Sequence, residues 1–128
     1  MAAGLNDHLV LYDADCGVCK WMLGKLLERD RDHRLRPVAL QSEEAGHLLA
    51  DLTTEQRMAS WHLVAPDGRR WSAGAALPPL LELLPRGRRP AALFARFPRA
   101  TERGYRLVAD HRALLAKILP ARRDLPGP

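Results

Sequence analysis

The chain has 128 residues, of which 47% are hydrophobic, and its formal net charge is +5. This length suits one domain around one modest core, and the hydrophobic fraction excludes an intrinsically disordered chain. No apolar run approaches the roughly 18 residues of a membrane-spanning helix, and residues 1–7 lack the pattern of a secretory signal. We therefore expect a cytoplasmic protein.

The excess positive charge comes from arginines that are scattered along the chain and interleaved with acidic residues. Such a pattern is typical of a solvated surface, so we expect no specific nucleic-acid partner. The basic, amphipathic stretch at residues 86–97 leaves contact with a membrane surface or a docking partner as a weaker alternative.

The first half of the chain predicts a strand, a helix and a second strand. The apolar run His8–Tyr12 predicts a buried strand, and apolar residues at three- and four-residue spacing predict a helix over Gly17–Arg29. Leu35–Leu40 predicts the second strand, which should run parallel to the first because a helix connects them. Ser42 can cap a short helix that follows, and we expect residues 53–57 to be connecting chain.

The second half predicts a hairpin. Ser60–Val64 and Arg69–Ser72 have strand character, and the turn signal Pro66-Asp67-Gly68 separates them. We expect Trp61 and Trp71 to face each other across this hairpin.

Three helices should follow the hairpin, over Leu77–Leu84, Pro90–Phe97 and Ala100–Leu119, with Pro98 separating the last two. We expect the tail at residues 122–128 to be mobile. The order of elements predicts an α/β fold, namely a thioredoxin-like four-stranded mixed sheet with flanking helices and a helical C-terminal extension. Residues 1–128 should form a single domain, with a core at about 8–84 and the extension at about 90–119.

Two cysteines, Cys16 and Cys19, stand between the first strand and the first helix. The unpaired N–H groups and the positive dipole end of a helix stabilise a thiolate there, so the pKa of Cys16 should fall. Cys19 lies one turn later on the apolar face and should be more buried. These positions predict that Cys16 exchanges with a substrate disulfide as the nucleophile and that Cys19 resolves the mixed disulfide.

Two carboxylates precede the cysteines. A carboxylate beside Cys16 opposes the ionisation of its thiol. The alternative role for Asp13 or Asp15 is to cap the helix, and a further alternative for Asp13 is to relay protons. We include Asp13, and less firmly Asp15, in the catalytic site as helpers.

The stretch from Leu11 to Cys19, with its Asp-x-x-Cys-x-x-Cys pattern, resembles the signature of the DCC family of thiol-disulfide oxidoreductases. The resemblance extends over about residues 8–119 and includes the segments 37–45, 61–74 and 105–112. It implies a thioredoxin-like fold and dithiol–disulfide exchange, with Asp13, Cys16 and Cys19 as motif residues.

The chain departs from the expected pattern at two places. Ala14 stands where the family commonly has glycine, so a positive φ at this turn is in question. Thioredoxins place a cis-proline before the third strand, where it helps to bind substrate backbone, whereas residues 58–61 contain no proline.

We therefore predict a thiol-disulfide oxidoreductase that exchanges electrons with protein or small-molecule disulfides and an unknown reductant. It needs no organic cofactor because the dithiol carries both electrons, and we predict no metal site. The alternative is a non-catalytic binding module or a redox or metal sensor, in which histidines join the two cysteines around zinc. The histidines considered are His33, His47, His62 and His111.

Overall fold

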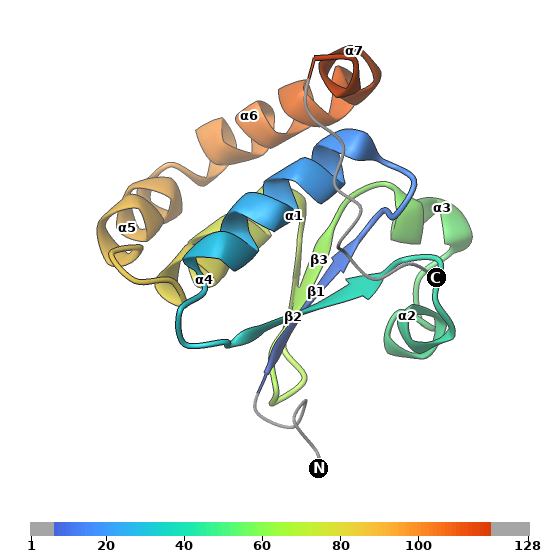
Figure 1. The fold of residues 1–128 in the computed structure, drawn as a ribbon, viewed down its shortest axis with the longest axis horizontal. Helices are drawn as coiled ribbons and strands as arrows, with labels where there is room; N and C mark the ends of the chain where they lie inside the picture. Colours follow the sequence, from blue (N-terminus) through green and yellow to red (C-terminus); the bar gives the residue numbers. More distant parts are fainter. Residues whose placement is uncertain (1–6, 119–128) are drawn as a thin grey trace.

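The computed structural model describes residues 7–118, in which four strands form one mixed sheet between helical layers (Figure 1). The strand order is β2-β1-β3-β4, with β1 parallel to β2 and the other neighbours antiparallel. This arrangement confirms the predicted thioredoxin-like α/β fold. The strands are β1 (His8–Tyr12), β2 (Leu35–Ala39), β3 (His62–Val64) and β4 (Arg70–Ser72).

Both faces of the sheet are covered, because successive side chains of a strand point to opposite sides. In β1, Val10 and Tyr12 join the core beneath α1 (Gly17–Arg29) and α4 (Leu77–Glu82). Leu9 and Leu11 join a second core beneath α2 (Glu43–Leu48) and α3 (Thr54–Met58). The end of β1 is therefore buried on both sides, and the turn into α1 begins from a fixed position.

Three C-terminal helices form an outer layer beyond α1 and α4 (Figure 1). They are α5 (Arg88–Arg96), α6 (Pro98–Asp110) and α7 (Arg112–Ala116). α5 packs on α4, α6 packs on the 3₁₀ turn η2 (Ala73–Ala76), and α7 packs on α1. Residues from late in the chain thus reach the start of α1. Among the described helices, none has the length and apolar character to cross a membrane.

The helix expected over Ala100–Leu119 is instead two helices, and this boundary prediction was wrong. α6 begins at Pro98 itself, since a proline is tolerated in the first helical turn, where its missing N–H would have no partner. α6 ends at Asp110, and His111 separates it from α7. The expected end at Leu119 and the tail at 122–128 lie outside the described residues.

The prediction of connecting chain at residues 53–57 was also wrong, because this segment contains α3. The Thr53 hydroxyl accepts a bond of 3.1 Å from the Gln56 N–H, and the Gln56 side chain accepts one of 2.9 Å from the Thr53 N–H. This reciprocal capping box offsets the cost of forming so short a helix.

The two tryptophans of the hairpin do not face each other. Leu63 pairs with Trp71, and the backbone carbonyl of Trp61 accepts a bond of 3.2 Å from Ala73. The turn is centred on Asp67, and the Ala65 N–H donates to the Arg69 carbonyl at 2.8 Å. The centre of the turn determines which residues of β3 and β4 stand opposite each other. Trp61 is therefore opposite Ala73 and not opposite Trp71.

Candidate active site

Cys16 is the N-cap of α1, and its sulfur faces the first turn of the helix. Its backbone is extended, with φ −99° and ψ 113°, and Cys16 Sγ accepts a bond of 3.3 Å from the Cys19 N–H. A thiolate at this position satisfies a helix N–H that otherwise has no partner within the helix. Cys16 thus has the environment of a reactive cysteine rather than of a structural one.

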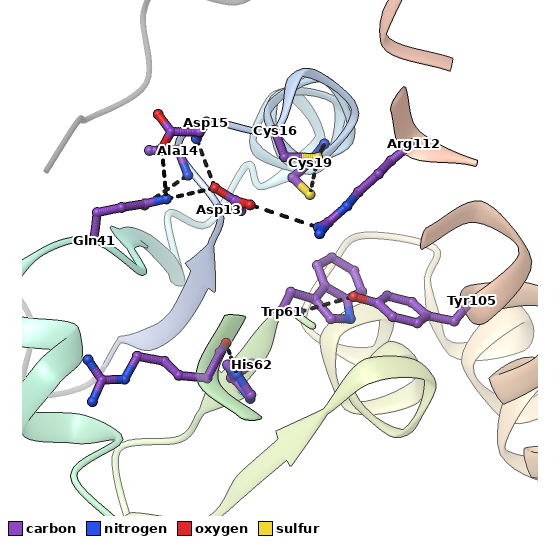
Figure 2. A network of polar contacts seen from close by, with 11 residues as sticks. Asp13, Ala14, Asp15, Cys16, Cys19, Gln41, Trp61, His62, Tyr105 and Arg112 are labelled. Atoms are coloured by element: carbon purple, nitrogen blue, oxygen red, sulfur yellow. Dashed lines mark hydrogen bonds and ion pairs between the residues drawn. The ribbon is translucent and has the colours of Figure 1, made fainter. Parts of the chain in front are cut away.

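The two sulfurs are direct neighbours. Cys16 and Cys19 are both free thiols, and their Sγ atoms lie 2.7 Å apart with the Cys19 thiol directed at Cys16 (Figure 2). This donated bond is the largest of the influences that lower the pKa of Cys16 to about 6, and the Cys19 N–H and Arg112 act in the same direction. Burial and Asp13 oppose them. The same bond, followed by burial, raises the pKa of Cys19.

The exposed surface of the pair differs from expectation. Cys16 is only 8% exposed, whereas Cys19 is half-buried, so the prediction that Cys19 would be the more covered residue was wrong. The reason is that Cys19 lines an apolar cavity, whereas Cys16, at the start of the helix, does not.

Asp13 organises the turn that leads into α1. Its backbone carbonyl accepts a bond of 3.1 Å from the Cys16 N–H, and its Oδ1 accepts bonds from the Asp15 N–H at 2.9 Å and the Gln41 side chain at 2.7 Å. Gln41 also accepts a bond of 3.1 Å from the Ala14 N–H, so it holds the turn from the end of β2. Ala14 does not adopt a positive φ, so this turn does not require glycine at that position.

Asp15 occupies the exposed side of the same turn. Its Oδ2 lies 3.5 Å from the Gln41 Nε2, at the limit of a hydrogen bond (Figure 2). The structure thus places Asp13, Asp15 and Cys16 in the turn before α1, with Cys19 in the first turn of the helix.

Arg112 completes the site from the other end of the sequence. Its guanidinium extends from α7 towards the two sulfurs and lies 3.8 Å from Asp13 Oδ2 (Figure 2). Its positive charge lowers the pKa of both cysteines. Sequence reasoning placed residues 105–112 in a terminal helix but did not identify Arg112 as a site residue.

Tyr105 covers the chain just before β3. Its hydroxyl accepts a bond of 3.0 Å from the Trp61 N–H, and the two rings stack with centroids 5.8 Å apart. Burial raises the pKa of Tyr105 to about 12, so the hydroxyl stays protonated. The backbone N–H of Trp61, in the segment where a thioredoxin binds substrate backbone, is therefore already occupied.

An apolar cavity of about 450 Å³ opens beside Cys19, between α1 and the C-terminal helices. Cys19 lines this cavity and Cys16 does not, and Arg112 and Tyr105 belong to its wall. The other lining side chains are mostly apolar. They include Tyr12, Met22, Phe94 and Val108.

The sequence spacing of the cavity residues in α6 and α7 is a signal that could have identified them. Tyr105, Val108 and Ala109 of α6 and Arg112 of α7 stand at positions i, i+3, i+4 and i+7, the spacing of one face of the single helix that the sequence predicts over Ala100–Leu119. A tyrosine and an arginine on an otherwise apolar stripe are candidates for a site rather than for core packing.

The described part of the chain contains no group of three or more His, Cys, Asp or Glu side chains that could hold a metal ion. His62, one of the histidines considered as ligands, is 2% exposed and has both ring nitrogens engaged. Nε2 donates to the Arg57 carbonyl at 3.0 Å, so Nδ1 accepts from the Ser72 hydroxyl at 2.6 Å. Burial is the largest cause that lowers the pKa of His62, which favours this neutral tautomer.

No curated protein and no solved structure matches the chain significantly. Residues 10–117, however, match the family described as DCC1-like thiol-disulfide oxidoreductase. This match includes the dithiol, the turn that holds it and Arg112. The chain therefore belongs to the DCC1-like thiol-disulfide oxidoreductase family.

Proposed function

We propose that this protein is an active thiol-disulfide oxidoreductase in which Cys16 is the nucleophile and Cys19 the resolving thiol. The observation that carries the proposal is the asymmetry of the pair. Cys16 accepts hydrogen bonds from both the thiol and the N–H of Cys19, so one sulfur is stabilised as a thiolate while its neighbour keeps its proton.

The exchange takes two steps. The Cys16 thiolate attacks one sulfur of a substrate disulfide, forming a mixed disulfide and releasing the other half of the substrate as a thiolate. Cys19 then loses its proton to solvent and attacks Cys16 Sγ, which releases the second half. The substrate gains two electrons, its two thiolates take protons from solvent, and the protein is left with a Cys16–Cys19 disulfide.

We assign Asp13 and Arg112 supporting roles. Asp13 holds the turn and, through an ion pair of 3.8 Å, holds Arg112 near the sulfurs, where the cation stabilises each thiolate. Asp15 is the weaker helper, because its carboxylate is exposed and its contact at 3.5 Å is to Gln41. Its expected place in catalysis, like the cytoplasmic location and the single-domain division of the chain, stays a prediction.

A redox titration tests the proposal. The protein is equilibrated in glutathione buffers of graded ratio, its thiols are trapped by alkylation, and the reduced fraction is measured by mass spectrometry. We expect a reversible two-electron transition in the parent and no intramolecular disulfide in Cys16→Ser. We also expect the parent, but not this variant, to reduce a model disulfide such as dithiobis(nitrobenzoate) at a catalytic rate. If the cysteines never pair, the binding-module alternative replaces the enzyme.

A further inference from the structure

The apolar cavity beside Cys19 has no role in the two-step exchange described above. Its volume of about 450 Å³ lies within the range of roughly 300–1,000 Å³ typical of sites for small molecules. Leu93 and Phe97 line it and are 57% and 51% exposed, so part of its apolar wall is open to solvent. An apolar molecule entering here would exchange water for carbon contacts, which is the main source of affinity in such sites.

The cavity reaches one sulfur and not the other. Cys19 is part of its wall, whereas Cys16, the N-cap of α1, is not. A thiolate attacks a disulfide along the axis of the S–S bond, so a thiolate in the cavity approaches the oxidised pair at Cys19 with Cys16 as the leaving group. Because a thiol of lower pKa leaves faster, the stabilised Cys16 thiolate favours attack from this side.

The polar groups at the cavity also suit an incoming thiolate. Arg112 belongs to the wall and supplies a positive charge beside Cys19. The Tyr105 hydroxyl accepts from the Trp61 N–H and keeps its own proton, whereas the Thr101 hydroxyl donates to backbone carbonyls, with Phe94 at 3.0 Å and Phe97 at 2.9 Å. Arg112 is the cation in the wall and matches the charge of a thiolate, and the protonated Tyr105 hydroxyl adds a neutral donor.

An extended peptide is a poorer occupant. The Trp61 N–H, which a peptide strand would need in order to pair with the chain before β3, already donates to Tyr105. α5 and α6 form the walls of the cavity opposite α1, which encloses a compact molecule rather than a strand.

We propose that the cavity binds small apolar thiols, and that such a thiol regenerates the reduced protein by attacking Cys19 of the disulfide. The proposal rests on the dithiol chemistry proposed above and supplies its reductant class. The first thiolate forms a bond to Cys19 Sγ and breaks the bond to Cys16, which leaves as a thiolate. A second molecule of the thiol attacks the sulfur of the first, which yields the apolar disulfide and returns Cys19, protonated, to its thiol form.

The test compares two alkyl thiols of similar acidity, phenylmethanethiol and 2-mercaptoethanol, as reductants of the oxidised protein. The readout is the ratio of their second-order rates, which cancels general effects of a substitution on the disulfide. We expect phenylmethanethiol to react about 10 times faster than 2-mercaptoethanol, or more, with the parent. Burying an aromatic ring contributes a free energy that corresponds to at least this factor. Acid quenching early in the reaction should trap the phenylmethanethiol adduct, and peptide mapping should place it on Cys19.

Gly104→Leu is the cavity-filling variant. Gly104 lines the cavity, and a Cβ built there meets no atom within 4 Å, so a leucine enters open space. Arg103→Leu is the matched control, because it adds the same side chain to α6 at an exposed position outside the cavity wall. Ala109→Leu fills the same cavity from another position and replaces Gly104→Leu if that variant does not fold.

We expect the rate ratio to fall towards one in Gly104→Leu and to persist in Arg103→Leu. A ratio near one in the parent, a ratio unchanged by filling the cavity, or an adduct on Cys16 would overturn the inference. If the dithiol still gives a reversible redox transition in that case, the proposed function stands without it. If no disulfide forms at all, both proposals fail.

Discussion

The guanidinium of Arg112 lies 3.8 Å from the Asp13 carboxylate, which ties α7 to the turn that precedes the dithiol. This ion pair joins the two ends of the described fold and fixes a cation beside two sulfurs. Because Asp13 is itself held by Gln41 and by the Asp15 N–H, the cation is held by a rigid turn rather than by a flexible loop.

Arg112→Gln should raise the pKa of Cys16 above its value of about 6, by up to about one pH unit, because a positive charge beside the thiolate is lost. The pH dependence of iodoacetamide alkylation of the reduced protein measures this shift. Arg103→Gln, which removes an exposed arginine on α6, is the control and should leave the midpoint unchanged. Equal midpoints for the parent and Arg112→Gln would refute the assigned role.

Cys19→Ala should raise the pKa of Cys16 further than Arg112→Gln does. The thiol of Cys19 is the largest cause of the low value, and alanine cannot donate to the Cys16 sulfur. The midpoint of the same alkylation profile should therefore move towards 9.0, the ordinary pKa of a cysteine thiol. If the midpoint stays near 6, the helix N-terminus rather than the Cys19 thiol sets the reactivity.

Tyr105→Phe should destabilise the protein by about 1 kcal/mol, because the Trp61 N–H loses its acceptor while the stacked ring is kept. Urea unfolding followed by tryptophan fluorescence gives the free energy of unfolding. Tyr105→Leu removes both the hydroxyl and the ring and should cost more. Stability equal to that of the parent in Tyr105→Phe would mean that water replaces the hydroxyl at no cost.

His62 should make the protein less stable in mild acid. Its pKa is lowered in the folded state, so below the unfolded value of 6.5 the unfolded chain binds a proton that the folded chain does not. Stability is therefore present above pH 6.5 and is lost as the pH falls, at up to about 1.4 kcal/mol per pH unit for one proton.

Free energies of unfolding at pH 7 and pH 5.5 test this dependence. His62→Gln should lose less stability than the parent between the two values. His47→Gln, which removes an exposed histidine from α2, is the control and should behave like the parent. A parent and a His62→Gln protein with the same pH dependence would contradict the prediction.

The parts of the fold that depend on neighbouring residues could be predicted from the sequence. The apolar run His8–Tyr12 and the periodicity of Gly17–Arg29 define a strand and a helix, and the place of the dithiol follows because it lies between them. The hairpin was found from its turn, but its register was not, since the register depends on Asp67 being the centre of that turn. α3 could have been found from the spacing of Thr53 and Gln56.

The rest of the candidate site depends on contacts between distant parts of the chain. Arg112 reaches the sulfurs only because α7 packs on α1, and Tyr105 meets Trp61 only because α6 packs on η2. No local pattern specifies either packing. The sequence spacing of Tyr105 and Arg112 groups the two residues, but it does not indicate which part of the molecule they cover.

The docking of α7 on α1 also has a consequence for the chain as it is synthesised. The two cysteines emerge from the ribosome well before Arg112 does. Until α6 and α7 dock, the cysteines lack both the cation and the covering wall that Tyr105 helps to form. The nascent chain therefore carries a dithiol without its full activation, and the site matures only when translation has passed α7.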